Sequence, residues 1–185
     1  MSRLAIFDEG GRLLESEADA ARISARLDGV GVLFERWEAE EKLAAGAGQD
    51  DILAAYRRPV DRLKRHYGFQ AADVISLSAD HPGKAALRQK FLDEHTHSEF
   101  EVRFFVAGGG LFYIHAGDKV YAVYCRQGDL ISVPARMPHW FDMGEQPELT
   151  CIRLFTNPEG WVAHYTGSDI ARRLPTLDAF LAGQP

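Results

Sequence analysis

The sequence predicts a mainly β protein, an antiparallel barrel or double-sheet sandwich with a few peripheral helices. Two observations predict this class. From about Asp73 onward, short runs rich in β-branched and aromatic residues alternate with turn residues. The connections are rich in glycine, as in AGGG and HAGDK, which favours tight turns between antiparallel strands. The runs are VISLSA, EVRFFVAG, LFYIHAG, KVYAVYC, DLISVP and LTCIRLF.

The length of 185 residues, 46% of them hydrophobic, is enough for one full core and little more. We therefore expect a single domain over residues 1–185. Its parts are an N-terminal embellishment of strands and helices (1–68), a barrel core (about 69–165) and a C-terminal tail (166–185) that packs back on the barrel.

The N-terminal part opens with a short strand at residues 3–7, followed by a DEGGR turn. Ser16 is a candidate N-cap for a helix that runs through ADAARISARL to Gly31. The next segment, GVLFERW, has strand character again.

A second helix is expected to start at Asp50 or Asp51 and to end at Gly68, a residue that favours helix C-termini. Pro59 should kink or divide it, because proline removes a backbone donor from the helix interior. Further on, PGKAALRQK predicts one or two helical turns, and residues 166–183 a small helix or loop.

The charge pattern excludes several partners. A net charge of −6, a pI near 5.6 and scattered basic residues argue against nucleic acid binding. The first residues reach charged positions too soon for a secretory signal, and no uncharged stretch approaches the ~20 apolar residues of a membrane span. We expect a soluble, cytoplasmic monomer with a small-molecule substrate.

The two cysteines, Cys125 and Cys151, each lie within an apolar, strand-like stretch. Buried free thiols are the simplest interpretation, since a structural disulfide is unusual in a reducing compartment. We assign them no chemical role.

The most informative stretch is EHTHSEFEVRFFVAGGG, residues 94–110. On an extended strand, side chains alternate between faces, so His95, His97, Glu101 and Arg103 share one side. Three of these four are metal-ligand types. Glu99 has the same parity as Glu101 and is the rival carboxylate, which strand parity alone does not exclude.

A third imidazole comes from QGDLISVPARMPHWF, where His139 follows two prolines. Antiparallel topology can return this strand to the first one. Three histidines and one carboxylate make a mixed nitrogen and oxygen site, which suits iron, nickel, manganese or cobalt better than a closed structural zinc site. The other histidines are expected to be structural or solvated: His66, His81, His115 and His164.

These residues are similar to the two cupin motifs. His95, His97, Glu101 and Gly108 satisfy H-x-H-x(3)-E-x(6)-G, and Gly128, Pro134 and His139 satisfy the second motif. The resemblance implies a cupin-type antiparallel barrel, also called a double-stranded β-helix or jelly roll. The chain departs from the motifs in three places: the glycine upstream of the first histidine is missing, Arg136 replaces a glycine, and Met143 stands where many cupins have asparagine.

Within the cupins, FLDEHTHSEFEVRFFV and VPARMPHWFDMG resemble the acireductone dioxygenase family of methionine salvage, and the similarity extends more weakly over nearly the whole chain. The resemblance implies oxidation of 1,2-dihydroxy-3-keto-5-methylthiopentene by O2, with the substrate enediolate chelating one Fe(2+) or Ni(2+) per chain. The iron form is implied to give 4-methylthio-2-oxobutanoate and formate. The nickel form is implied to give 3-methylthiopropanoate, formate and carbon monoxide.

The resemblance also suggests roles around the metal. The positive charge of Arg103 should favour the ionised enediol, unless it forms only a structural ion pair. Glu94 is the second candidate catalytic residue, through orientation of His95 or metal loading. Phe100 replaces an acidic residue that is frequent in the family, which puts metal-dependent switching in doubt. The expected substrate-binding residues are Arg153, Phe91, Phe104, Phe141 and Trp161.

Two other function classes stay open. A cupin isomerase or epimerase acting on a phosphosugar would need a basic cluster at the pocket, and the sequence offers only Arg103 and Arg153. A non-catalytic metal-binding sensor would need neither four intact ligands nor an inward-facing arginine. Oxygen consumption distinguishes both from a dioxygenase.

Overall fold

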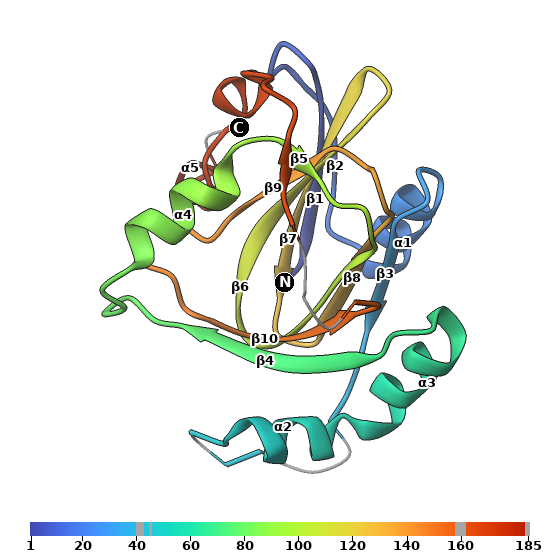
Figure 1. Cartoon of the computed structure of the whole chain (residues 1–185). Helices are drawn as coiled ribbons and strands as arrows, with labels where there is room; N and C mark the ends of the chain where they lie inside the picture. Colours follow the sequence, from blue (N-terminus) through green and yellow to red (C-terminus); the bar gives the residue numbers. More distant parts are fainter. Residues whose placement is uncertain (40–42, 45, 158–161, 184–185) are drawn as a thin grey trace.

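The computed structural model describes residues 1–39, 43–44, 46–157 and 162–183, and their core is a barrel of two antiparallel sheets (Figure 1). The fold class predicted from the sequence is confirmed. One sheet has the strand order β11-β5-β9-β6-β7-β1-β2, and the other has the order β4-β10-β6-β8-β3. The strands are β1 (Arg3–Asp8), β2 (Leu13–Glu17), β3 (Leu33–Arg36), β4 (Ala71–Leu77), β5 (His95–Thr96), β6 (Glu101–Ala116), β7 (Lys119–Arg126), β8 (Asp129–Val133), β9 (His139–Asp142), β10 (Leu149–Phe155) and β11 (His164–Tyr165).

Strand β6 belongs to both sheets. The sequence predicted a turn at AGGG, but β6 is a single strand of 16 residues that runs through this segment. Its first part pairs with β8 and β10, and its second part pairs with β7 and β9. The ladder with β10 skips Val106, so the inward face changes from odd residues such as Phe105 to even residues such as Phe112. Gly108 has φ +65°, and a Cβ there would lie 1.7 Å from the Glu148 carbonyl oxygen, so only glycine fits.

The N-terminal residues contribute more than the peripheral embellishment we expected. Strand β1 pairs with β7 in one sheet, and β3 pairs with β8 in the other. Between them, helix α1 (Ala20–Asp28) begins later than predicted. Its N-cap is Asp19 rather than Ser16, and the Asp19 carboxylate accepts a hydrogen bond from the Arg22 amide.

The second predicted helix is two helices, α2 (Gln49–Ala55) and α3 (Arg57–Tyr67), which cover the outside of β4 and β10 (Figure 1). The division falls at Tyr56, three residues before the expected Pro59. Pro59 is tolerated in the first turn of α3, where the backbone amides have no intrahelical acceptor. Gly68 ends α3 in the left-handed conformation, as predicted.

Three hydrophobic clusters hold the fold together. One fills the barrel, a second lies between it and α2 and α3, and a third packs the 3-10 helix η1 (Ile170–Arg173) and α5 (Leu177–Leu181) against β1, β7 and β9. Helix α4 (Lys84–Leu92) lies beside β9. Cys125 and Cys151 are buried and free, as expected. Among the described residues, no helix is both long and apolar enough to span a bilayer.

Candidate metal centre

The four predicted ligands converge inside the barrel. His95 lies on β5, His97 follows it, Glu101 opens β6 and His139 opens β9. All four side chains are buried, and one potential ligand atom from each lies within 4.8 Å of the others. The short β5 pairs with β9 so that His95 and His139 are direct register partners. This pairing brings the two sequence clusters together, as the antiparallel prediction required.

The route of the chain between these ligands differs from the prediction. We expected one extended strand from His95 to Arg103, but the chain bends at Ser98 and Glu99 before β6 begins. The bend decides between the rival carboxylates. Glu99 points away and accepts hydrogen bonds from the backbone amides of Thr156 and Asn157, at 3.2 and 3.1 Å.

The three imidazole rings are oriented by the backbone. Each Nδ1 lies at hydrogen-bond distance from a carbonyl oxygen, and a carbonyl can only accept, so each Nδ1 carries the proton. The Nε2 lone pairs then face the centre of the cluster, as metal-binding histidines require. The acceptors are Asp93 for His95 (2.8 Å), Val162 for His97 (2.8 Å) and Met137 for His139 (2.7 Å).

The arrangement fits a cation. Glu101 Oε2 lies 3.0 Å from His97 Nε2 and 3.0 Å from His139 Nε2. With Nδ1 protonated, both nitrogens are acceptors, and so is the carboxylate. Lone pairs from nitrogen and oxygen would repel one another at this distance unless a positive charge were shared among them. A divalent metal ion satisfies all four groups at once.

The ionisation states also suit metal binding. Burial raises the pKa of Glu101, but the charge of Arg103 and, when they also carry a proton on Nε2, the rings of His139 and His97 outweigh it and hold the pKa well below its usual range. Burial lowers the pKa of His95 to about 4. Burial also lowers the pKa of His97, but Glu101 outweighs this effect and raises it. A metal ion must therefore displace a proton where His97 is protonated.

Arg103 faces the same cavity as the ligands, as predicted. Its Nε lies 2.8 Å from Glu101 Oε1, and its side chain is buried. Its guanidinium carbon lies 4.8 Å from the ring centre of Phe141, 5.4 Å from Phe91 and 5.5 Å from Phe112. The aromatic rings hold the cation in place and keep bulk water from it.

A cavity of about 360 Å³ opens from the four ligands and Arg103. Three of the predicted substrate residues line it: Phe91 from α4, Phe141 from β9 and Arg153 from β10. Asp73, which no sequence motif indicated, pairs with Arg153 through two hydrogen bonds of 2.9 and 2.6 Å. The remaining lining residues are Ile75, Leu87, Lys90, Phe155 and Ala163.

Other predicted site residues lie elsewhere. Phe104 is on the opposite face of β6 from Arg103 and stacks on Trp37, 4.9 Å between ring centres, so its assignment to the cavity was wrong. Alternation along the strand, with even residues facing outward here, was the signal that would have corrected it. Trp161 lies outside the described residues.

Glu94 is buried but does not line the cavity. Its carboxylate lies 2.7 Å from His115 Nδ1 and accepts a 2.7 Å hydrogen bond from the Thr166 hydroxyl. It therefore does not orient His95 through its side chain, because the ring partner of His95 is the Asp93 carbonyl.

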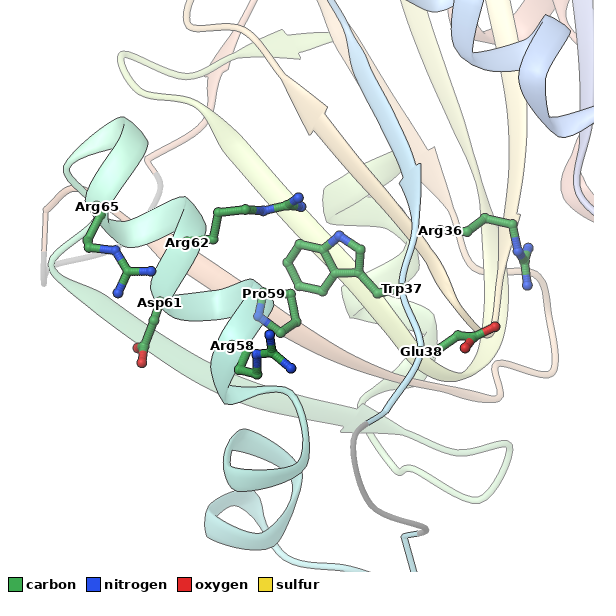
Figure 2. Close-up of a pocket in the computed structure, with 8 residues that line it drawn as sticks. All are labelled: Arg36, Trp37, Glu38, Arg58, Pro59, Asp61, Arg62 and Arg65. Carbon is green, nitrogen blue, oxygen red and sulfur yellow. The ribbon is translucent and has the colours of Figure 1, made fainter.

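A larger groove of about 600 Å³ lies outside the barrel between α3 and β3 (Figure 2). We call it the α3 groove. Its only carboxylates among the described lining residues are Glu38 and Asp61, which Figure 2 shows pointing away from each other. Within the described part of the chain, the groove has no cluster of ligand atoms like that of the barrel cavity. The lining residues are Arg36, Trp37, Glu38, Arg58, Pro59, Asp61, Arg62 and Arg65.

A barrel of two antiparallel sheets that encloses three imidazoles and one carboxylate defines a mononuclear metal-binding cupin. The model of the ARD/ARD' family matches residues 3–163. The chain is 54% identical to the acireductone dioxygenase of Aquifex aeolicus over 183 residues, covering 99% of this chain and 100% of that protein. It is 58% identical to the acireductone dioxygenase of Methylococcus capsulatus, covering 98% of each.

Among solved structures, the chain is similar to the acireductone dioxygenase from Bacillus anthracis with a cadmium ion in its active centre. The TM-score is 0.78 at 32% identity, covering 89% of this chain and 98% of that one. The chain therefore belongs to the ARD/ARD' family of acireductone dioxygenases, and it is an oxidoreductase with a buried site of three histidines and one glutamate.

Proposed function

We propose that this enzyme cleaves 1,2-dihydroxy-3-keto-5-methylthiopentene with O2 in methionine salvage, using one Fe(2+) or Ni(2+) per chain. The iron form gives 4-methylthio-2-oxobutanoate and formate, and the nickel form gives 3-methylthiopropanoate, formate and carbon monoxide. The observation that carries the proposal is the shared cavity of four ligand side chains and Arg103. Its family membership supports the substrate.

The donor set supports iron or nickel. Three neutral imidazoles and one carboxylate are borderline ligands that both ions accept, and an ion held by only these four side chains would keep positions free for a chelating enediolate. A bound ion of either kind supplies Lewis acidity and a template for the substrate oxygens. The cadmium ion in the Bacillus anthracis relative supports a divalent ion in the corresponding place.

Arg103 is the residue proposed to favour the ionised substrate. Its guanidinium is fixed by Glu101 and by aromatic rings, so no reorganisation is needed when negative charge enters the cavity. A fixed cation beside the substrate lowers the pKa of an enediol hydroxyl there, because it favours the charged form. The enediolate is the electron-rich form that reacts with O2.

The apolar side chains of the cavity are proposed to bind the methylthioethyl tail. Phe91 and Phe141 form part of the wall around Arg103, and Ile75 and Leu87 extend it. Arg153, paired with Asp73 and in register with Arg103, is proposed to contact polar substrate atoms in the cavity. The role of Trp161 in the tail site stays a prediction.

The test is oxygen uptake with the synthetic acireductone, using enzyme loaded separately with Fe(2+) and Ni(2+). We expect one O2 per substrate in both cases, and carbon monoxide only from the nickel form. A cupin isomerase or epimerase would convert substrate without O2, and a metal sensor would bind metal without turnover. Identical products from both metal forms would overturn the proposed metal dependence while leaving the dioxygenase activity.

A further inference from the structure

Helix α4 forms one wall of the metal-site cavity and packs on the barrel core through one apolar face only. Leu87 and Phe91, four residues apart on one face, line the cavity, yet no residue of α4 is buried. The helix begins after Gly83 without a side-chain cap. Polar contacts made by its other faces therefore add to this packing in fixing the position of the helix.

The strongest of these contacts is made by Arg88. Its Nε and Nη2 donate to the two carboxylate oxygens of Asp142 at 2.7 and 3.0 Å, which is the bidentate geometry that arginine alone provides. Asp142 is completely buried and also accepts hydrogen bonds from the amides of Gly144 (2.9 Å) and Leu177 (2.8 Å). The acceptor is thus fixed from three directions.

The contact connects the helix to the metal site. Asp142 ends β9, the strand that His139 opens, so Arg88 ties α4 to the backbone that carries a ligand. Two residues further along the helix, the Tyr165 hydroxyl donates to the Lys90 carbonyl at 2.9 Å, and Tyr165 is the register partner of His95. The segment from Leu87 to Phe91 is therefore connected to β9, which carries His139, and to β11, which pairs with the strand that carries His95.

We propose that Arg88 is a positioning residue that sets how closely Leu87 and Phe91 approach the substrate tail, and so sets selectivity for the methylthio group. The inference rests on the proposed function. Arg88 does not line the cavity and does not touch substrate. Its effect passes through the helix, whose Phe91 ring also lies 5.4 Å from the guanidinium carbon of Arg103.

The test compares two substrates in the Arg88→Lys variant. Lysine keeps the charge beside buried Asp142 but replaces a rigid bidentate contact with a single flexible one. The probes are the acireductone and its analogue in which hydrogen replaces the methylthio group. We expect KM for the full substrate to rise by about tenfold, the scale of one apolar group in a pocket, with kcat within about twofold. KM for the analogue should stay nearly constant.

Arg26→Lys is the matched control, because Arg26 pairs with Glu15 on the exposed surface. Metal content and thermal unfolding of each variant separate folding from positioning. In the Phe91→Ala background, the effect of Arg88→Lys on selectivity should disappear, because the wall that it positions has been removed. Unchanged selectivity in folded, metal-loaded Arg88→Lys would overturn the inference.

If Arg88→Lys does not fold, Tyr165→Phe decides, since it removes only the hydrogen bond at the other end of the same segment. It should weaken selectivity in the same direction, and unchanged selectivity there would again contradict the inference. A wild-type enzyme that consumes no O2 with either substrate would instead refute the proposed function.

Discussion

The barrel cavity and the α3 groove differ in what their polar residues do. The groove is larger, about 600 against 360 Å³, and it has four arginines along it. Two of these arginines are engaged with carboxylates outside the lining: Arg62 with Glu35 at 2.6 Å, and Arg36 with buried Asp129. Figure 2 shows the side chains spread along α3 and β3 without a common centre.

In the barrel cavity, the polar side chains are buried and converge on one point. Every ring nitrogen that faces away from that point has a backbone acceptor, and Glu101 is contacted from three sides. Burial of such groups costs free energy unless hydrogen bonds, ion pairs or a metal ion offset their desolvation, whereas arginines at the surface cost little. Convergence and burial, rather than volume or charge count, identify the site.

The largest expected effect comes from removing a ligand. His97→Ala should abolish stoichiometric metal binding and lower kcat/KM by roughly 10³-fold, since the several kcal/mol supplied by the ion are lost. Metal content by mass spectrometry and oxygen uptake measure the two effects. His66→Ala is the control, because His66 is an exposed histidine on α3, and it should keep both metal and activity. Full metal occupancy in His97→Ala would contradict the assignment of the barrel cavity, rather than another region, as the metal site.

Removal of the cavity cation should affect turnover but not metal. Arg103→Met keeps a long apolar side chain among the aromatic rings and should lower kcat by about 10²-fold, the loss typical of one preorganised charge-stabilising group. Metal content and kcat of the loaded enzyme are the measurements. Arg62→Met, in the α3 groove, is the matched control and should leave kcat unchanged. Normal turnover in Arg103→Met would show that its pairing with Glu101 is only structural.

A smaller effect is expected at the turn that leads into β9. Arg136 has φ +64°, the conformation that the glycine of the cupin motif adopts without strain, and its amide donates to the His97 carbonyl. Arg136→Gly should raise the free energy of unfolding by about 0.5 kcal/mol, because relief of backbone strain exceeds the added entropy of the unfolded chain. Urea unfolding measures it. Arg136→Ala keeps the Cβ and should give no gain, so an equal gain there would exclude strain as the cause.

The smallest effect is expected in the α3 groove itself. The double variant Arg58→Gln and Arg65→Gln should change the free energy of unfolding by less than about 0.5 kcal/mol, as for surface substitutions in general. Its kcat/KM for the acireductone should stay within about twofold of the wild type. A large loss of activity would show that the groove takes part in catalysis and would overturn the distinction between the two regions.

The sequence alone was enough for the fold class and the three histidine ligands, because strand alternation, turn residues and the two histidine clusters are all local patterns. The choice of Glu101 over Glu99 rested on the family motif. It failed where neighbouring elements decide the geometry. The bend at Ser98 and Glu99 depends on Glu99 accepting amides from a loop 57 residues away. The bulge in β6 and the partner of Arg153 depend on β10 and β4, whose pairing leaves no local signal. Phe104 was misplaced although alternation alone would have placed it correctly.

The sharing of β6 between the two sheets has a consequence for assembly. Glu101 sits in the ladder with β8, whereas His95 and His139 pair with each other in the opposite sheet. Neither half of the barrel can offer a complete coordination sphere, so affinity for the ion arises only after both halves have closed around one another. Ion uptake during refolding would therefore report the last cooperative step, the closure of the barrel. Because the ion binds only the closed barrel, its binding would raise the free energy of unfolding.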